Sequence, residues 1–232
     1  DKLIAYLNNG GKVLISTSYI DCFSEEMPNL TKVLSEFGLS IGDGLIAEQD
    51  NARMYQNPIY LLPNVSSDSL TNGVYGKSYD YIMMPYAQPI LTKEKDGVTL
   101  TTLLTTSETA YSKTDLNQSS DVKKTEDDAQ GPFTVGVKAV KTLASGEEAQ
   151  LILYSSSYLF TESANQYTMD NNLTLFTNAI STMAGESESI SIPTKSMAST
   201  YATVPTASAV RYGILLMGIL PIGLLAAGII IW

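Results

Sequence analysis

The feature of this sequence that most constrains its fold is an uncharged apolar run at the C-terminal end. The last twenty residues read GILLMGILPIGLLAAGIIIW and show no polar face. At a rise of about 1.5 Å per residue, such a helix is about 30 Å long, the thickness of a bilayer's hydrocarbon core. Arg211, Tyr212 and Trp232 flank the run, where amphipathic side chains favour the headgroup layer, and Pro221 is tolerated mid-span with a kink. The run predicts a transmembrane helix; the alternative is an apolar helix buried in an oligomer.

Small residues in this run indicate where another helix can approach. Gly213, Gly218, Gly223 and Gly228 recur every five residues, a step of about 140° around a helix with 3.6 residues per turn, so we expect them not to line one face. Gly223 and Ala227 are four residues apart and form a small-residue patch. We predict that this patch is the helix-packing site, because close backbone approach drives association in lipid.

The rest of the chain is acidic and contains no histidine. There are 24 Asp and Glu against 14 Lys and Arg, for a formal net charge of -10. This charge argues against nucleic acid as a partner. A lone cysteine, Cys22, excludes a disulfide framework, and the absence of histidine excludes Ser-His-Asp triads and histidine-based zinc sites. We therefore expect a protein that is not an enzyme and has no metal or cofactor.

Helices and strands alternate in the first fifty residues. A helix ends before Gly10, and residues 12–17 form a short apolar strand of the kind buried on both faces. A second helix is predicted over 28–37 and a strand over 45–48. This alternation favours an α/β fold with a mostly parallel sheet.

Further strands and a last helix follow. A helix is predicted over 170–184, with its apolar face formed by Leu173, Phe176, Ile180 and Met183. Residues 119–130 are charged and lack a period, so we interpret Asp121, Glu126, Asp127 and Asp128 as part of a solvated, mobile loop rather than a calcium site. The other predicted strands cover 59–62, 79–85, 98–106, 133–140 and 150–156.

Composition divides the chain into three parts. Residues 1–185 are expected to form the α/β domain, which lacks its N-terminal part, and an upstream span is expected in the parent protein. Residues 186–209 are rich in Ser, Thr, Ala and Pro, a composition that predicts an extended tether. Residues 210–232 are the predicted transmembrane helix.

Serines follow three of the predicted strands. In parallel α/β sheets, ligands bind in the crevice beyond the carboxyl ends of the strands. Hydroxyl groups and free backbone amides at that edge can bind a sugar or an anion; the alternative is that they only cap helices and satisfy the loop backbone. A Gly-x-Ser-x-Gly elbow is absent, so a hydrolase with a degenerate active site is a weaker hypothesis. The candidate ligand-binding residues are Ser16, Ser18, Ser107, Ser155, Ser156 and Ser157.

An ordered series of short segments resembles one family. The pattern is similar to the extracytoplasmic part of GldG-type proteins, auxiliary components of ABC transport systems first linked to gliding motility. The resemblance implies a flavodoxin- or glutamine-amidotransferase-like α/β sheet without the amidotransferase catalytic residues. The matching segments are 3–15, 28–30, 37–39, 42–46, 60–63, 104–107, 153–157 and 171–183.

The resemblance and the anchor together give a functional expectation. We expect a non-enzymatic accessory subunit of a bacterial ABC transporter, with its soluble domain outside the cell membrane and its helix in membrane lipid beside the permease subunit. The ATPase subunit is expected to be a separate chain, because this one has no Walker motif. The alternative is a cell-surface glycan- or peptide-binding sensor without a transporter.

Overall fold

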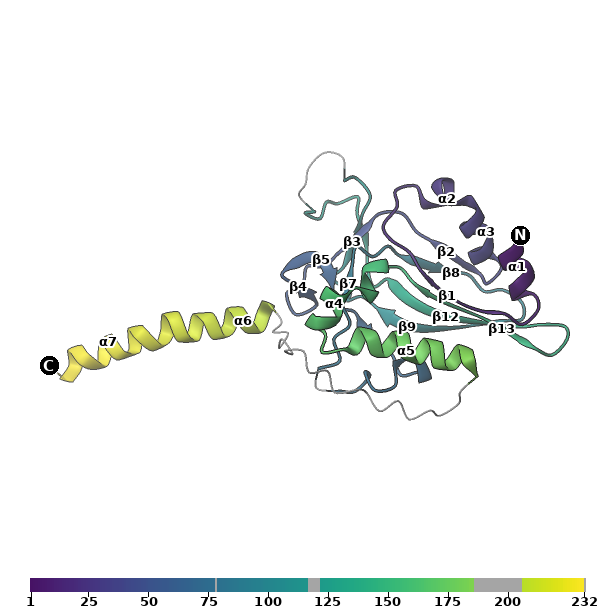
Figure 1. The fold of residues 1–232 in the computed structure, drawn as a ribbon. Coiled ribbons are helices and arrows are strands. Elements are labelled where there is room, and N and C mark those ends of the chain that lie inside the picture. Colours follow the sequence, from purple (N-terminus) through teal and green to yellow (C-terminus); the bar gives the residue numbers. More distant parts are fainter. Residues whose placement is uncertain (78, 117–121, 186–205, 232) are drawn as a thin grey trace.

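A seven-stranded sheet forms the centre of the domain, with helices on both faces (Figure 1). The computed structural model describes residues 1–77, 79–116, 122–185 and 206–231. The main path of the sheet is β1-β13-β12-β8-β2, and β9 pairs with both β12 and β6. These strands are β1 (Lys12–Ser16), β2 (Leu39–Ile41), β6 (Asn64–Val65), β8 (Ile90–Thr92), β9 (Val98–Thr105), β12 (Thr134–Thr142) and β13 (Glu148–Tyr154).

The strand directions correct one prediction from the sequence. Strand β1 runs parallel to β13, with Lys12 opposite Gln150 and Ser16 opposite Tyr154. All other pairings among the described strands are antiparallel. The domain combines helices with mixed sheets, as predicted in the coarser sense, but the predicted mostly parallel sheet is wrong. Strands β12 and β13 are joined by a turn in which Gly146 has φ +87°, and so short a connection makes neighbouring strands antiparallel.

Strand β1 is also less buried than its sequence indicates. All five of its residues are partly exposed, and it lies at one end of the strand order. Both faces of the strand are covered as predicted, with Leu14 packed against one core and Val13 and Ile15 against the other, but the burial is incomplete. A short apolar run at a sheet edge looks the same in sequence as a central strand, because the difference depends only on neighbours that are distant along the chain.

Two apolar cores lie on opposite faces of the sheet. Helices α1 (Lys2–Leu7), α2 (Phe23–Glu26) and α3 (Pro28–Ser35) cover one face, and α5 (Asn171–Ala184) covers the other (Figure 1). Strand β12 contributes to both cores. Its register shifts on either side of Gly136, so Val135 packs in the α5 core whereas Val137 packs in the α3 core.

Smaller elements complete the domain. Two three-stranded sheets have the orders β11-β10-β3 and β4-β5-β7. The strand predicted over 79–85 is reduced to its last two residues, in β7. The remaining elements are β3 (Leu45–Ala47), β4 (Met54–Tyr55), β5 (Asn57–Leu61), β7 (Met84–Pro85), β10 (Tyr111–Lys113), β11 (Ala129–Gln130), η1 (Ser69–Thr71), η2 (Ser157–Phe160) and α4 (Glu162–Tyr167).

Helix α5 has the predicted extent but a different buried face. It ends at Gly185, whose φ of +79° is the left-handed conformation that glycine adopts without a Cβ penalty. Its buried residues are Asn171, Asn172, Leu175 and Ala179. The predicted apolar face is wrong in large part, because its first three residues are exposed and only Met183 packs against the core.

One residue of the acidic loop is buried, contrary to the prediction. The side chain of Asp128 is only 3% exposed and lies 3.2 Å from the Nζ of Lys113 on β10. Asp128 therefore does not belong to a solvated loop. Among its predicted companions, Asp121 lies outside the described residues, and no group of three or more His, Cys, Asp or Glu in the described part of the chain can hold a metal ion.

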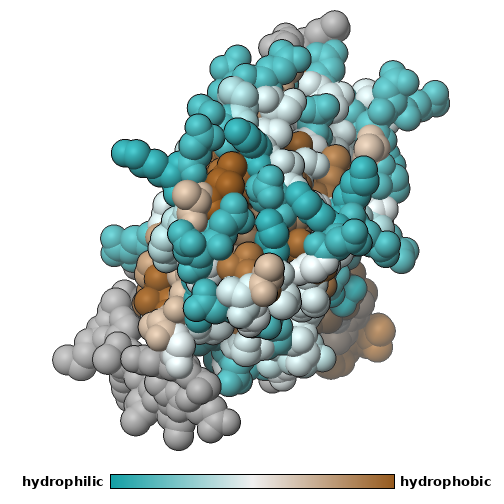
Figure 2. All heavy atoms as spheres, turned by 90° about the vertical axis from the view of Figure 1, so that its right-hand side faces the viewer, coloured by the Kyte–Doolittle hydropathy of each residue, from teal (hydrophilic) through white to brown (hydrophobic). Residues whose placement is uncertain are grey.

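One face of the domain is mainly hydrophilic (Figure 2). Figure 2 views the molecule from the side that carries α1 and the turn between β12 and β13. Hydrophilic side chains cover most of this face, and apolar residues appear in small separate patches between them. This distribution is typical of a surface exposed to water.

The C-terminal helix stands apart from the domain (Figure 1). It comprises α6 (Thr206–Gly213), a π-helical segment (Ile214–Ile219) and α7 (Leu220–Ile231). The most apolar 18-residue window within Ser208–Ile231 has a mean hydropathy of 2.7, and none of that window is buried against the described part of the chain. The π segment ends two residues before Pro221, which lacks the N–H that a regular α-helix would use at this position. The helix is long and apolar enough to span a membrane. Most of the predicted tether lies outside the described residues.

Candidate functional site

The serine-bearing strands end at one edge of the sheet. Strand β1 is parallel to β13, and β12 is antiparallel to both β13 and β9. It follows that β1, β13 and β9 point in the same direction, although β12 separates β9 from the other two. Ser16 and Ser18, the three serines 155–157 and Ser107 therefore lie along the same edge.

Three of these serines satisfy backbone groups. The Oγ of Ser16 donates to the carbonyl of Ser156 at 2.8 Å, and the Oγ of Ser156 donates to the carbonyl of Pro85. The Oγ of Ser155 donates to the carbonyl of Val135 at 3.3 Å. Ser155 and Ser156 are fully buried, so their hydroxyl groups hold the strand ends together rather than facing a ligand.

Ser18 and Ser157 form the surface part of the cluster. Their hydroxyl oxygens contact each other across the ends of β1 and β13. The loop that carries Ser18 is fixed by the buried amide of Gln88, which accepts from the N–H of Ile20 at 2.9 Å and donates to its carbonyl at 3.0 Å. Between the strand and this loop, the buried hydroxyl of Thr17 has no hydrogen-bond partner among the described residues.

Ser107 belongs to a separate network around a buried carboxylate. Glu48 is 2% exposed, and its oxygens accept from the hydroxyls of Ser107 and Thr109, each at 2.7 Å. The N–H groups of Gln49 and Asp50 also donate to Glu48, at 2.9 and 3.0 Å. Nothing in the sequence pattern indicated this acceptor. With four donors, the carboxylate serves to fix the loops after β3 and β9.

A row of tyrosines adjoins the surface serines. The Tyr86 ring lies 5.9 Å from Tyr60 and 5.1 Å from Tyr158, measured between centroids. Tyr158 directly follows Ser157 in the sequence. Tyr86 directly follows Pro85, whose carbonyl accepts the hydrogen bond from Ser156. Tyr86 has φ +57°, a left-handed conformation that costs energy in a bulky residue. A hydrogen bond with Tyr60, together with burial, raises the pKa of Tyr86.

The side chains at this edge are of the types that contact small polar ligands. Partly buried hydroxyls beside aromatic rings suit a neutral polar molecule with an apolar face, because the rings cover its C–H groups while the hydroxyls exchange hydrogen bonds. Neither Ser18 nor Ser157 has a basic group among its hydrogen-bond partners in the described residues. The sequence pointed to the serines, whereas the tyrosines come from separate segments and no spacing links them.

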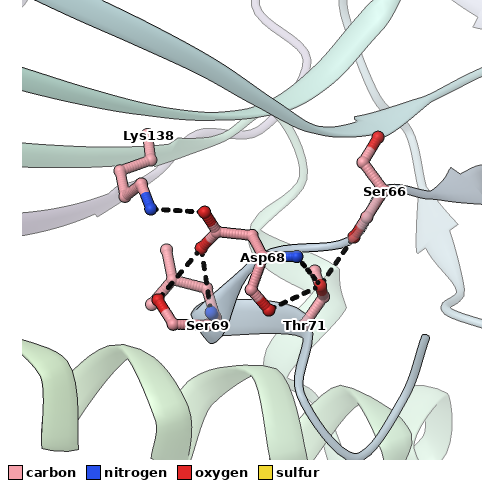
Figure 3. Close-up of polar contacts among 6 residues, drawn as sticks. Ser66, Asp68, Ser69, Thr71 and Lys138 are labelled. Atoms are coloured by element: carbon pink, nitrogen blue, oxygen red, sulfur yellow. Dashed lines mark hydrogen bonds and ion pairs between the residues drawn. The ribbon is translucent and has the colours of Figure 1, made fainter. Parts of the chain in front are cut away.

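A second polar cluster joins η1 to the sheet (Figure 3). The carboxylate of Asp68 accepts from the N–H of Leu70 at 2.9 Å and from the ammonium of Lys138 on β12. Thr71 donates its hydroxyl to the carbonyl of Ser66 at 2.6 Å. Burial acts to raise the pKa of Asp68, but the hydrogen bonds from Leu70 and Lys138 hold that pKa below its usual value. The cluster positions η1 beside α5 and the sheet.

The helix-packing residues lie on an unobstructed helix. Nothing lies within 4 Å of a Cβ added at Gly223, so a larger side chain there meets no part of the described chain. The π segment also changes the prediction for the first two glycines. Because π-helical hydrogen bonds run from i to i+5, Gly213 and Gly218 lie on nearly the same side, whereas an α-helix would separate them by about 140°.

Comparisons with known proteins inform the fold only. No protein-family model and no curated protein matches the chain. Among solved structures, the chain is similar to the "mmIFT52 N-terminal domain", with a TM-score of 0.53 and 12% sequence identity. That match covers 82% of this chain and 71% of the other. At this identity, the likeness shows a shared arrangement of elements and says nothing of ligand or partner.

Proposed function

We propose that this chain is a non-enzymatic accessory subunit of a bacterial ABC transporter. Its domain lies outside the cell membrane and acts by binding and coupling, and its C-terminal helix lies in membrane lipid beside the permease. A separate ATPase chain supplies nucleotide hydrolysis. The observation that carries the proposal is the apolar helix over Ser208–Ile231, of which no part is buried in the chain, so that lipid or another membrane protein must cover it. The part of the proposal that concerns a transporter rests on the resemblance to GldG-type proteins.

The first test concerns the contact between the helix and the permease. We expect Gly223→Leu to reduce co-purification of the permease about fivefold, because a bulky side chain prevents close backbone packing in lipid. Leu215→Ile is the control, since Leu215 is exposed on the same helix and keeps its volume. The measurement is permease recovered per anchored chain after affinity capture from solubilised membranes. Full recovery with a poly-leucine helix would assign recognition to the domain.

The second test concerns orientation. Cys22, the sole cysteine, is exposed in the domain. An extracytoplasmic domain is expected to react with a membrane-impermeant maleimide in intact cells, and the Cys22→Ser chain is the blank. Asp21 raises the pKa of the Cys22 thiol, so labelling is best done at a pH of about 8.5, where more thiolate forms. Labelling only after the cells are lysed would place the domain in the cytoplasm.

The serine and tyrosine edge favours a second candidate, a cell-surface glycan-binding sensor. In this case, Tyr158→Ala is expected to weaken binding of neutral oligosaccharides about tenfold, because a stacking surface is lost. Tyr79→Ala is the matched control: Tyr79 is 56% exposed against 46% for Tyr158, and it lies outside the row of rings. Calorimetric titration of the purified chain measures the effect. Genes for an ATPase and a permease beside this one would favour the transporter subunit instead.

A further inference from the structure

Helix α5 presents an apolar face that no described part of the chain covers. Leu173, Phe176 and Ile180 are 49%, 37% and 46% exposed and follow one another at helical spacing. The ring of Phe176 is held in place by Phe160, at 5.2 Å between centroids. An apolar stripe of this kind on an exposed helix is typical of a surface that packs against another chain.

The charges around α5 are distributed in a particular way. None of the residues of α5 is charged, although the chain carries a net charge of -10. A hollow at the start of the helix is lined by Glu162 together with Leu173 and Phe176. A second hollow, at the end of the helix, is lined by Lys12 together with Ile180. The uncharged face therefore lies between Glu162 and the N-cap residue Asp170 at its start and Lys12 at its end, where Glu147 also lies close to Gly10.

We propose that α5 packs antiparallel against α5 of a second copy of this chain. A two-fold axis passing between Phe176 and Thr177 places Leu173 of each copy against Ile180 of the other. The same symmetry brings Glu162 of each copy toward Lys12 of the other, which gives two equivalent ion pairs. An interface about a two-fold axis is self-complementary in this way, because every contact occurs twice.

Charge explains why the second copy would use this face. Two chains of the same strong negative charge repel each other, and the repulsion is least where the surface carries no acidic residue. A parallel arrangement of the two helices would place Glu162 against Glu162, whereas the antiparallel one pairs opposite charges. The charge pattern thus selects both the surface and the direction of packing.

The size of the helix sets the strength of the contact. Fourteen residues make α5 about 21 Å long, and the face of one such helix is smaller than a typical stable interface. The dimer is therefore weak in dilute solution. Anchoring confines both copies to one membrane and raises their effective concentration, so the dimer forms there. This association requires neither a permease nor a glycan.

Cysteine cross-linking of the full anchored chain in lipid vesicles tests the axis. In a Cys22→Ser background, Thr177→Cys is expected to form a disulfide-linked dimer under mild oxidation, because the axis brings the two copies of residue 177 together. Ser35→Cys is the control, an exposed hydroxyl residue at the end of α3, on the opposite face of the sheet. Equal cross-linking at both positions would overturn the proposal, and so would a cross-link at residue 177 to a protein of another size.

Charge reversal tests the direction of packing. Each of the single variants Glu162→Lys and Lys12→Glu is expected to lower the cross-linked fraction about threefold. The double variant is expected to restore the cross-linked fraction, because the ion pairs then form with reversed charges. Phe176→Glu is expected to lower the cross-linked fraction at least about tenfold, because Phe176 lies at the centre of the proposed interface, where single residues contribute most to binding. Circular dichroism confirms that each variant is folded. A double variant that cross-links no better than the single ones would exclude the antiparallel dimer.

Discussion

Asn172→Ala is expected to lower the free energy of unfolding of the domain by about 3 kcal/mol, because it leaves several buried backbone groups without partners. Asn172 is fully buried. Its Oδ1 accepts from the N–H of Met83 at 3.1 Å, and its Nδ2 donates to the carbonyls of Met83 and Leu159 at 3.0 and 2.7 Å. One side chain thus joins α5 to the segment just before β7 and to η2.

The effect can be measured by urea unfolding of the anchored chain in detergent, followed by circular dichroism. Thr177→Ala on the same helix is the control, since Thr177 is exposed and its replacement is expected to change stability by less than about 0.5 kcal/mol. A shift no larger than that of the control would mean that water replaces the amide. In that case, Asn172 does not determine how α5 docks.

Helix α5 also shows how far the sequence predicts the fold. Its period, its length and its terminal glycine were evident from the sequence, and the helix forms as expected. The buried face was not evident, because the widest apolar stripe is not the one that packs. The core side consists of Leu175 and Ala179 with two asparagines that bind loop backbone, and a sequence pattern carries no information about such loops.

The sheet gives the same lesson at a larger scale. Strands β9, β12 and β13 were predicted close to their observed bounds. Their directions depend on which connections are hairpins and which cross the sheet. The alternation of helices and strands near the N-terminus led us to expect crossover connections, and hence parallel strands, throughout the sheet. The serines were placed at one edge because β1 and β13 are parallel. The tyrosines beside them were missed, since rings from three distant segments meet only in the folded chain.

Lys113→Met is expected to destabilise the domain by about 3 kcal/mol at neutral pH, because removing one partner leaves a buried charge uncompensated. The side chains of Lys113 and Asp128 are 8% and 3% exposed. Lys113 also donates to the hydroxyl of Thr125 at 3.3 Å. We expect the low end of the usual range, since the pair lies under a surface loop rather than in either apolar core.

An exposed pair of the same geometry provides the control. Lys32 and Asp1 are 3.3 Å apart, but their side chains are 63% and 95% exposed. Lys32→Met is therefore expected to cost less than about 1 kcal/mol. The double variant Lys113→Met with Asp128→Leu is expected to recover much of the lost stability, because no buried charge then remains.

The pH dependence identifies the charge as the cause. Burial acts to raise the pKa of Asp128, but hydrogen bonds from Thr125 and Lys113 hold it below its usual value. In the unaltered chain, this carboxylate therefore contributes stability above a pH of about 4, and that contribution is lost as the pH falls through the folded-state pKa. In Lys113→Met the pKa of Asp128 is expected to rise, so that its carboxyl group can protonate in the folded chain. The loss of unfolding free energy caused by the substitution is therefore expected to shrink as the pH falls to about 4. Urea unfolding of both chains between neutral pH and that value measures the difference. A cost that stays constant across this range would assign the effect of Lys113 to the packing of its methylene groups.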